Sequence, residues 1–412
     1  MDLQPAKFYF SELFLLVFGV ALITLDASQS YTHYVNYLSL AFIGVTAVEM
    51  SVKGHLRMDR FRFIFPMFGF LIFSWMMLIF NFEGLQRQIT YSLVFLLFAS
   101  VFLVIRTTAR TWPIELALAI GVLIIWKTQG ASFAEVKSFK GQRLEFTVGS
   151  DEGGLNANLY GLYLVLCVFF CIKFLLIDSV IKKKRTIWWW GRCALMVIAA
   201  LLSVQQIIFV TGSRKAQLML FASFAVAYLI YTIGGKDRKT FKIAVGSMAM
   251  VLTNIFVWFE LKESDHFNRI ENMFDMVRYG ESSETSATSR VELAQQALSL
   301  WIRSPLWGQG PEGFATKSGH GVYCHSGYLE ILCNFGLIGV TVYYFVFYRV
   351  FRISWKWRKS SFESLRKYSF WLLGVFGSIC LLFEPFAVTY YMKIMAVYLG
   401  CIFGVVAFIE RR

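Results

Sequence analysis

Residues 156–185 read NANLYGLYLVLCVFFCIKFLLIDSVIKKKR, an apolar run followed closely by four basic residues. About 20 apolar residues suffice for one helical crossing of a bilayer. Basic residues beside such a run are retained on the cytoplasmic side of the membrane. This stretch therefore predicts a transmembrane helix whose C-terminal end faces the cytoplasm.

The chain as a whole has the composition of an integral membrane protein. Of its 412 residues, 57% are hydrophobic, 18% are aromatic and only 16% are charged, and the mean hydropathy is +0.57. In soluble chains about a quarter of the residues are charged, so a soluble enzyme with one small anchor is excluded. We expect about twelve spans in a single all-α membrane domain, residues 1–412. The apolar runs lie near 9–25, 34–50, 63–82, 89–105, 114–126, 156–178, 193–211, 217–233, 243–260, 326–348, 368–387 and 389–409.

Basic residues are concentrated in alternate connectors between these runs. The positive-inside rule assigns such connectors to the cytoplasm and places both termini there. Topology therefore explains the net charge of +14, and we expect no nucleic-acid partner. The basic connectors contain Lys53 to Arg62, Arg106 and Arg110, Lys182 to Arg192, Lys236 to Lys242, and Arg349 to Lys367.

Two long connectors remain on the outer face, residues 127–155 and 261–325. Long connectors in a compact domain are usually functional or disordered, and these mix aromatic, glycine and charged residues. The first apolar run is interpreted as a span, because no small-residue cleavage site follows it ahead of a soluble domain. The seven cysteines show no metal-ligand spacing. Function is therefore expected on the outer face, and no metal site is predicted.

One short outer connector, residues 211–217, reads TGSRKAQ. Because an unpaired charge at the membrane is costly, Arg214 and Lys215 are expected to have a partner. The planar guanidinium of Arg214 matches phosphate oxygens, and Lys215 adds a point charge. The motif therefore predicts a fixed anion site. The competing interpretation is two side chains that extend from a helix end towards lipid headgroups.

The long connector 261–325 contains Ser289 and Glu292 at capping-box spacing, followed by apolar residues at helical spacing. This pattern predicts an amphipathic helix that starts here, with Arg290 in its first turn. Arginine and helix end are then expected to hold one phosphate together. The alternative is an ordinary interfacial helix with a solvated arginine. Residues 303–310, RSPLWGQG, predict a glycine-rich turn that ends the helix.

His325 and Ser326 lie where this connector re-enters the membrane, ahead of Gly336 and Gly339. An imidazole titrates near neutral pH, so it can take a proton from a sugar hydroxyl or donate one to a phosphate oxygen. Glycines at this spacing let a neighbouring helix approach closely. His325 is thus the candidate that activates an acceptor. A histidine at a membrane edge is more often structural, and His320 is a second candidate for the same role.

These motifs resemble the bacterial O-antigen ligase and polysaccharide polymerase superfamily. The resemblance lies in TGSRKAQ, in the Arg290 helix that runs into PLWGQG, and in His325-Ser326 with its paired glycines. A further match runs from Arg143 to NANLYG at residues 156–161, where Ala157 replaces the proline of the family's Asn-Pro-Asn. Together the matches span roughly residues 143–340.

The resemblance implies a multi-spanning, GT-C-like glycosyltransferase that needs neither a metal nor a cofactor and takes an undecaprenyl-diphosphate-linked glycan as donor. Without a metal, fixed positive charge has to stabilise the diphosphate leaving group. Arg214 and Arg290 are expected to supply it, while His325 activates the acceptor hydroxyl for inverting attack at the anomeric carbon. Further candidates for binding the diphosphate or the glycan are Lys215, Arg143, Arg303, His320, Trp301 and Trp307.

The superfamily also implies the bacterial inner membrane, with the active site on the periplasmic face. Its members differ in the acceptor: a polymerase extends a lipid-linked repeat unit, and a ligase transfers the glycan to lipid A core. Residues 211–216 and the Asn156–Asn158 region resemble polymerases slightly more. We therefore expect a polymerase of O-antigen or a related surface polysaccharide, with a ligase as the alternative. Membrane lipids and other polysaccharide-assembly proteins are the further expected partners.

A transporter of a lipid-linked or anionic solute is the alternative from a different class. Charges within or beside spans would then mark a translocation pathway. Transporters usually contain internal repeats with interrupted helices in matching places, and the two halves of this sequence show no convincing self-similarity. The charges concerned are Glu115, Lys173, Glu384 and Lys393.

Overall fold

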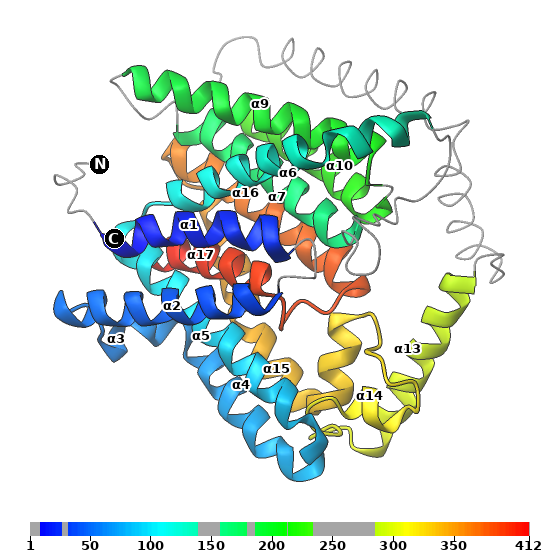
Figure 1. The fold of residues 1–412 in the computed structure, drawn as a ribbon. Coiled ribbons are helices and arrows are strands. Elements are labelled where there is room, and N and C mark those ends of the chain that lie inside the picture. Colours follow the sequence, from blue (N-terminus) through cyan, green and yellow to red (C-terminus); the bar gives the residue numbers. More distant parts are fainter. Residues whose placement is uncertain are drawn as a thin grey trace.

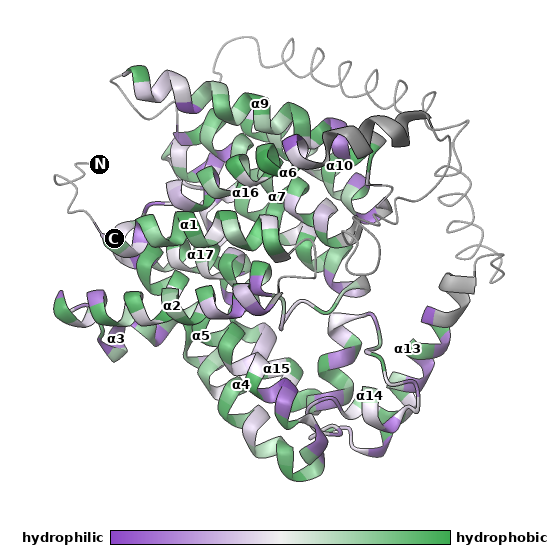
Figure 2. Ribbon diagram, in the orientation of Figure 1, coloured by the Kyte–Doolittle hydropathy of each residue, from purple (hydrophilic) through white to green (hydrophobic). Residues whose placement is uncertain are grey.

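The computed structural model describes residues 9–26, 32–138, 157–178, 186–211, 213–233 and 285–411, and these contain helices and turns but no strand. The predicted all-α fold class is therefore confirmed. Long helices pack into a bundle, and α13 and α14 lie at one end of it, beside α15 (Figure 1). Hydrophobic residues dominate the bundle helices, whereas polar residues gather around α13 and α14 (Figure 2).

The helices follow one another without long irregular connections in the described ranges. Short 3₁₀ segments flank α4, and π-helical turns extend α7 (Phe174–Asp178) and α16 (Ile379–Phe383). The α-helices are α1 (Phe10–Asp26), α2 (Thr32–Val52), α3 (Met58–Phe61), α4 (Phe65–Met76), α5 (Leu85–Thr108), α6 (Trp112–Ser138), α7 (Ala157–Lys173), α9 (Ile187–Phe209), α10 (Arg214–Ile233), α13 (Thr285–Arg303), α14 (Gly313–Lys317), α15 (Gly327–Trp357), α16 (Glu363–Ser378) and α17 (Lys393–Glu410).

Nine helices in the described ranges are long and apolar enough to cross a membrane, and Phe10–Leu25 forms a shorter apolar helix. Eleven of the twelve predicted runs coincide with helices, including the weak run at 114–126, which lies within α6. The remaining run, 243–260, lies outside the described residues. The predicted outer connector 127–155 also lies mostly outside them, and α6 extends into it as far as Ser138. A multi-pass membrane protein is therefore confirmed.

The centre of the bundle is the contact between α5 and α17. α17 is buried along almost its whole length. Two glycines on α17 allow the close approach, because a Cβ at Gly400 would lie 2.8 Å from the carbonyl oxygen of Phe98. A Cβ at Gly404 would lie 2.9 Å from that of Phe102. In lipid, where helix association relies on packing, small residues of this kind let two backbones come together.

Replacing Gly400 by valine is expected to force α17 away from α5, because the new side chain would overlap the α5 backbone. Overpacking of a core typically costs about 1–3 kcal/mol, so the melting temperature of the detergent-solubilised protein should fall. The matched control is Gly44→Val on α2, where a Cβ meets nothing within 4 Å. Equal melting temperatures for the two variants would contradict this packing.

Buried charges join the ends of α6, α7 and α9. The Nζ of Lys173 lies 2.9 Å from Oε1 of Glu115 and 2.5 Å from Oδ2 of Asp178. Arg192 binds the other carboxylate oxygen of Glu115. Because both Lys173 and Glu115 are fully buried, removal of either would leave its partner charged and unpaired in an apolar core. These contacts favour a structural role for Lys173 and Glu115 over a place on a transport pathway.

Candidate active site

The predicted amphipathic helix of the long outer connector is α13, and its apolar face is buried. This helix packs against α14 and the first half of α15. The part of the connector that the structure describes, residues 285–325, is therefore a folded cap on one end of the bundle. The buried cluster beneath it consists of Leu293, Ala297, Leu300, Phe314, Cys324 and Cys333.

The start of α13 differs from the prediction. The helix begins at Thr285, four residues before Ser289, so Arg290 lies in the second turn and not in the first. Several small polar residues precede Ser289, and each is able to begin a helix. The first-turn amides of α13 are therefore not beside Arg290, and any anion that Arg290 binds depends on its side chain.

α15 is broken at Gly336, and the turn predicted at 303–310 fills the break. Gly336 has φ +64° and ψ −167°, far from helical values. The backbone amides of α15 that follow the break therefore bond to carbonyls of the turn. The amides of the turn in return bond to carbonyls of α15. The amides of Leu337 and Ile338 donate to the carbonyls of Pro305 and Leu306, at 2.9 and 3.2 Å. The amides of Gln309 and Gly310 donate to the carbonyls of Cys333 and Asn334, both at 2.9 Å.

Glycines in α15 and in the turn make this exchange of backbone hydrogen bonds possible. A Cβ at Gly336 would lie 2.3 Å from the carbonyl oxygen of Leu306, and a Cβ at Gly308 would lie 2.5 Å from the backbone of Asn334. Gly339 was expected to admit a neighbouring helix, and its nearest contact on another element is the ring of Phe70 on α4. Both glycines were predicted to face a neighbouring helix. Gly339 does so, whereas Gly336 packs against the turn.

Gly336→Ala is expected to detach the turn from α15, because alanine can neither adopt this backbone conformation cheaply nor fit against Leu306. Strained backbone of this kind costs about 1–3 kcal/mol before any overlap is counted. The control is Gly319→Ala, which also has positive φ but open space around it. Limited proteolysis of residues 304–326 should be much faster in Gly336→Ala than in Gly319→Ala. Equal cleavage rates would show that the exchange does not hold the turn.

His325 is held between two anchored neighbours. Its φ of +60° lies in the left-handed region. The amide of Cys324 donates to Oε2 of Glu330 at 2.9 Å, and Ser326 is the N-cap of α15, accepting from the amide of Leu329. The carboxylate of Glu330 is itself buried and accepts from Nδ2 of Asn334 at 3.0 Å. The backbone at His325 is therefore fixed from both sides.

Glu330 and Asn334 support the candidate site and were not predicted from the sequence. Asn334 links the two halves of the cap, because its Oδ1 accepts from the amide of Phe314 at 2.9 Å while its Nδ2 donates to Glu330. Both lie in the first turns of a span, where a buried polar side chain needs a hydrogen-bond partner. The signal in the sequence that could have identified them is the presence of polar residues at positions 330 and 334 of an apolar run.

Positive charges from two distant segments act on His325. Burial lowers the pKa of His325, and the charges of Arg290 on α13 and Lys215 on α10 lower it further. The imidazole is therefore neutral at pH 7 and able to accept a proton. Two predicted site residues, Arg290 and Lys215, thus act electrostatically on a third, His325. Arg214 precedes Lys215 as the first residue of α10.

The pKa of His325 is expected to rise towards 6.5 in Arg290→Gln, because one of the two nearby positive charges is removed. Histidine labelled with ¹³C and titrated by NMR in detergent reports this value, and the resonance is assigned by its loss in His325→Gln. Arg303→Gln, on the exposed last residue of α13, is the control and should leave the titration unchanged. Identical titrations in both variants would show that Arg290 is too distant to act on the imidazole.

The other predicted site residues have differing surroundings. The Nε1 of Trp301 donates to the carbonyl of Pro305 at 3.0 Å, and the ring of Trp307 lies 6.1 Å from that of Phe73. Both tryptophans therefore support the turn. Arg303 and His320 are exposed, and Arg143 lies outside the described residues. Among the described residues, no cluster of His, Cys, Asp or Glu is arranged to hold a metal ion.

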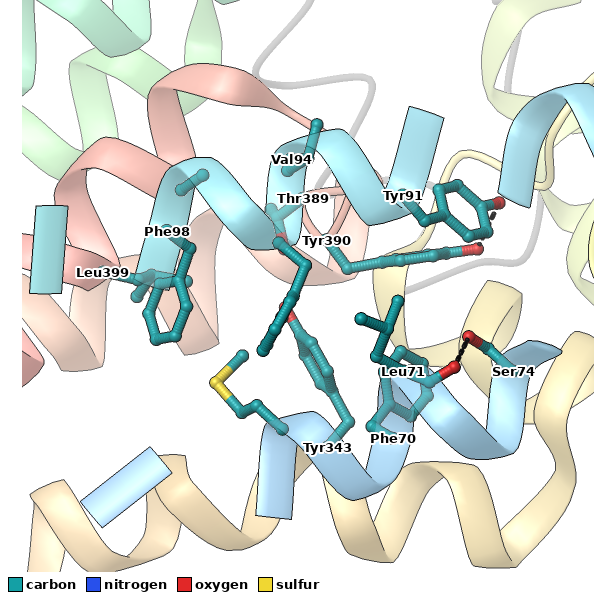
Figure 3. Close-up of a pocket in the computed structure, with 13 residues that line it drawn as sticks. Phe70, Leu71, Ser74, Tyr91, Val94, Phe98, Tyr343, Thr389, Tyr390 and Leu399 are labelled. Carbon is teal, nitrogen blue, oxygen red and sulfur yellow. Dashed lines mark hydrogen bonds between the residues drawn. The ribbon is translucent and has the colours of Figure 1, made fainter. Parts of the chain in front are cut away.

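A largely apolar pocket lies within the bundle, between α4, α5, α15 and α17 (Figure 3). The empty space of about 490 Å³ between its walls includes open solvent at its mouth. The hydroxyls of Tyr91 and Tyr390 lie 2.9 Å apart along its wall. The pocket is therefore aromatic and apolar, with a polar edge. Other residues around it are Phe70, Leu71, Val94, Phe98, Tyr343, Thr389 and Leu399.

Comparison with known families identifies the segment that contains this site. Residues 198–344 match the family model for O-antigen ligase. The matched segment includes TGSRKAQ, Arg290, His325 and Gly336. The resemblance to the O-antigen ligase and polymerase superfamily is therefore confirmed. A search of curated proteins finds no match to the chain.

Proposed function

We propose that this chain, whose residues 198–344 carry the O-antigen ligase family match, is a glycosyltransferase that moves a glycan from a lipid diphosphate to an acceptor hydroxyl. Members of this family are enzymes that act on lipid-linked glycans. One observation carries the proposal: the charges of Arg290 and Lys215 act on His325, although the three residues come from separate elements. This arrangement provides cations for a leaving group beside a neutral base.

In the proposed reaction, the acceptor oxygen bonds to the anomeric carbon while the bond from that carbon to the diphosphate oxygen breaks. The proton of the acceptor hydroxyl passes to a ring nitrogen of His325. The diphosphate leaves on its undecaprenyl carrier, and its developing negative charge is stabilised by Arg290, Arg214 and Lys215. Attack from the face opposite the leaving group inverts the anomeric configuration. Fixed cations take the role that a metal ion has in other transferases, so the reaction is proposed to be metal-independent.

The remaining predicted residues keep supporting roles in this proposal. Arg143, Arg303 and His320 are candidates for contact with the glycan or the diphosphate, and Trp301 and Trp307 for packing against sugar rings. The site is assigned to the periplasmic face of a bacterial inner membrane, because the basic connectors lie at the alternate helix ends. The neighbouring apolar pocket supports a role of the aromatic spans in holding a lipid chain.

Among the possible acceptors, we propose another lipid-linked repeat unit, which makes the chain a polymerase of O-antigen or a related polysaccharide. The support is the form of residues 211–216 and 156–158. Ligation to lipid A core is the second candidate, and the family match is named for that activity. The two reactions share the donor chemistry and differ only in which hydroxyl lies beside His325.

The test incubates the purified full-length protein with the native lipid-linked repeat unit, with and without lipid A core, in the presence of EDTA. Products are resolved by size. A ladder without the core is expected for a metal-independent polymerase. Transfer only when the core is present would make the chain a ligase, and loss of all product with EDTA would refute metal independence.

Variants of the site sharpen this assay. Arg290→Gln should lower kcat by about 10²–10³, the usual loss when one stabilising group for a leaving charge is removed. His325→Ala should lower it by about 10²–10⁴ and abolish the acid limb of the pH–rate profile. Arg57→Gln, at an exposed arginine in a basic connector, is the matched control. If Lys173 and Glu384 variants that keep their fold lost activity while Arg290 and His325 variants kept it, the transporter interpretation would replace this one.

A further inference from the structure

Tyr323 extends the site on the side of His325 that leads to α5 and α17. Its ring centroid lies 4.3 Å from that of His325, and 39% of the residue is exposed. The ring of Tyr391, just before α17, lies 6.4 Å from that of Tyr323 at an interplanar angle of 79°. Two aromatic rings thus continue from the imidazole, one on the cap and one in the segment before α17.

An ion pair borders these rings. The Nε of Arg87 on α5 lies 2.6 Å from Oε1 of Glu312, and the two side chains are 39% and 24% exposed. The guanidinium carbon of Arg87 lies 5.1 Å from the centroid of the Tyr391 ring. The pair has no net charge, yet it presents both N–H donors and carboxylate acceptors to solvent.

The aromatic surface is rigid because other residues support it. The ring of Tyr91 stacks on that of Tyr391 at 5.9 Å with an interplanar angle of 12°. Tyr91 is in turn fixed by the hydrogen bond between its hydroxyl and that of Tyr390 (Figure 3). Rings held in this way lose little conformational freedom when a ligand binds.

Two arginines of the site and its border act on Tyr323. Burial raises the pKa of Tyr323, whereas the positive charges of Arg290 and Arg87 act in the opposite direction. Lys215 and Arg290 act on His325. Arg290 therefore acts on both His325 and Tyr323, and the ring of Tyr323 lies beside that of His325.

We propose that Tyr323, Tyr391 and the Arg87–Glu312 pair form the binding site for the glycan of the acceptor. This inference rests on the proposed function, in which Arg290 and Lys215 hold the donor diphosphate and His325 meets the acceptor hydroxyl. A sugar has an apolar face of C–H groups, which packs on an aromatic ring. Its hydroxyls both donate and accept, which matches a neutral ion pair that offers both kinds of partner.

The charges argue for a glycan over an anionic ligand at this surface. A phosphate or a lipid headgroup is best held by arginine whose charge is not already compensated. The carboxylate of Glu312 neutralises Arg87 and would repel an anion. The uncharged part of the acceptor is therefore expected at the tyrosines.

The experiment measures binding of the free repeat-unit oligosaccharide, released from the native lipid-linked donor and so lacking both lipid and diphosphate. Saturation-transfer NMR and a competition titration are carried out on the full-length protein in detergent. Tyr323→Ala and Glu312→Gln should each weaken binding about tenfold or more, as expected for truncated contact residues at the centre of an interface. Tyr37→Ala on α2, another exposed tyrosine, is the matched control. Arg290→Gln should leave binding of the free oligosaccharide unchanged.

The outcomes separate this inference from the proposed function. If the parent protein does not bind the oligosaccharide at millimolar concentration, or if Arg290→Gln weakens binding while Tyr323→Ala does not, the inference is wrong. Tyr323→Phe, which keeps the ring, should retain binding and shows that a loss in Tyr323→Ala is not misfolding. The proposed function fails by a different result, namely the absence of any glycosidic product from the parent protein. An active enzyme whose Tyr323→Ala variant has an unchanged KM for acceptor would likewise overturn the inference.

Discussion

The exchange of backbone hydrogen bonds at Gly336 is the constraint on which the candidate site depends. A backbone amide or carbonyl left without a partner in an apolar environment costs several kcal/mol, so a membrane helix can break only where other groups replace its internal bonds. Residues 305–310 supply those groups from within the cap. The same contacts fix the end of α13 and the start of α14, and hence the segment that carries His325. A helix break thus becomes the attachment point of the cap.

Charge is distributed differently at the two ends of the bundle. Around Lys173, opposite charges are buried against one another and join helix ends. Around His325, the effect of Arg290 and Lys215 is to keep the imidazole neutral. Glu384 is a third case, since its buried carboxylate accepts hydrogen bonds from Tyr344 and Thr389 and lies against Gly327 at the start of α15. The buried charges of Lys173, Glu115 and Glu384 are therefore held by partners inside the bundle.

The proposed two-sided site gives a physical account of how related enzymes can share a donor and differ in acceptor. The cations come from α10 and α13, within the segment that matches the family. The aromatic surface combines Tyr323 and Glu312 from that segment with Arg87 and Tyr391, which lie on either side of it in sequence. Under this proposal, changes in α5 or before α17 would alter acceptor recognition without disturbing the groups proposed to stabilise the leaving diphosphate.

The sequence alone determined the fold class and eleven of the apolar runs that the structure shows as helices. These features follow from a local property, the length of each apolar run. It misplaced the start of α13 by four residues, because several neighbouring polar residues are able to begin that helix. It also missed Glu330, Asn334 and Tyr323, whose roles arise from partners elsewhere in the chain. Only the tertiary structure decided that the turn at residues 305–310 packs against Gly336 and that Lys173 is neutralised. Both depend on which distant segments of the chain come into contact, and no local sequence pattern encodes those contacts.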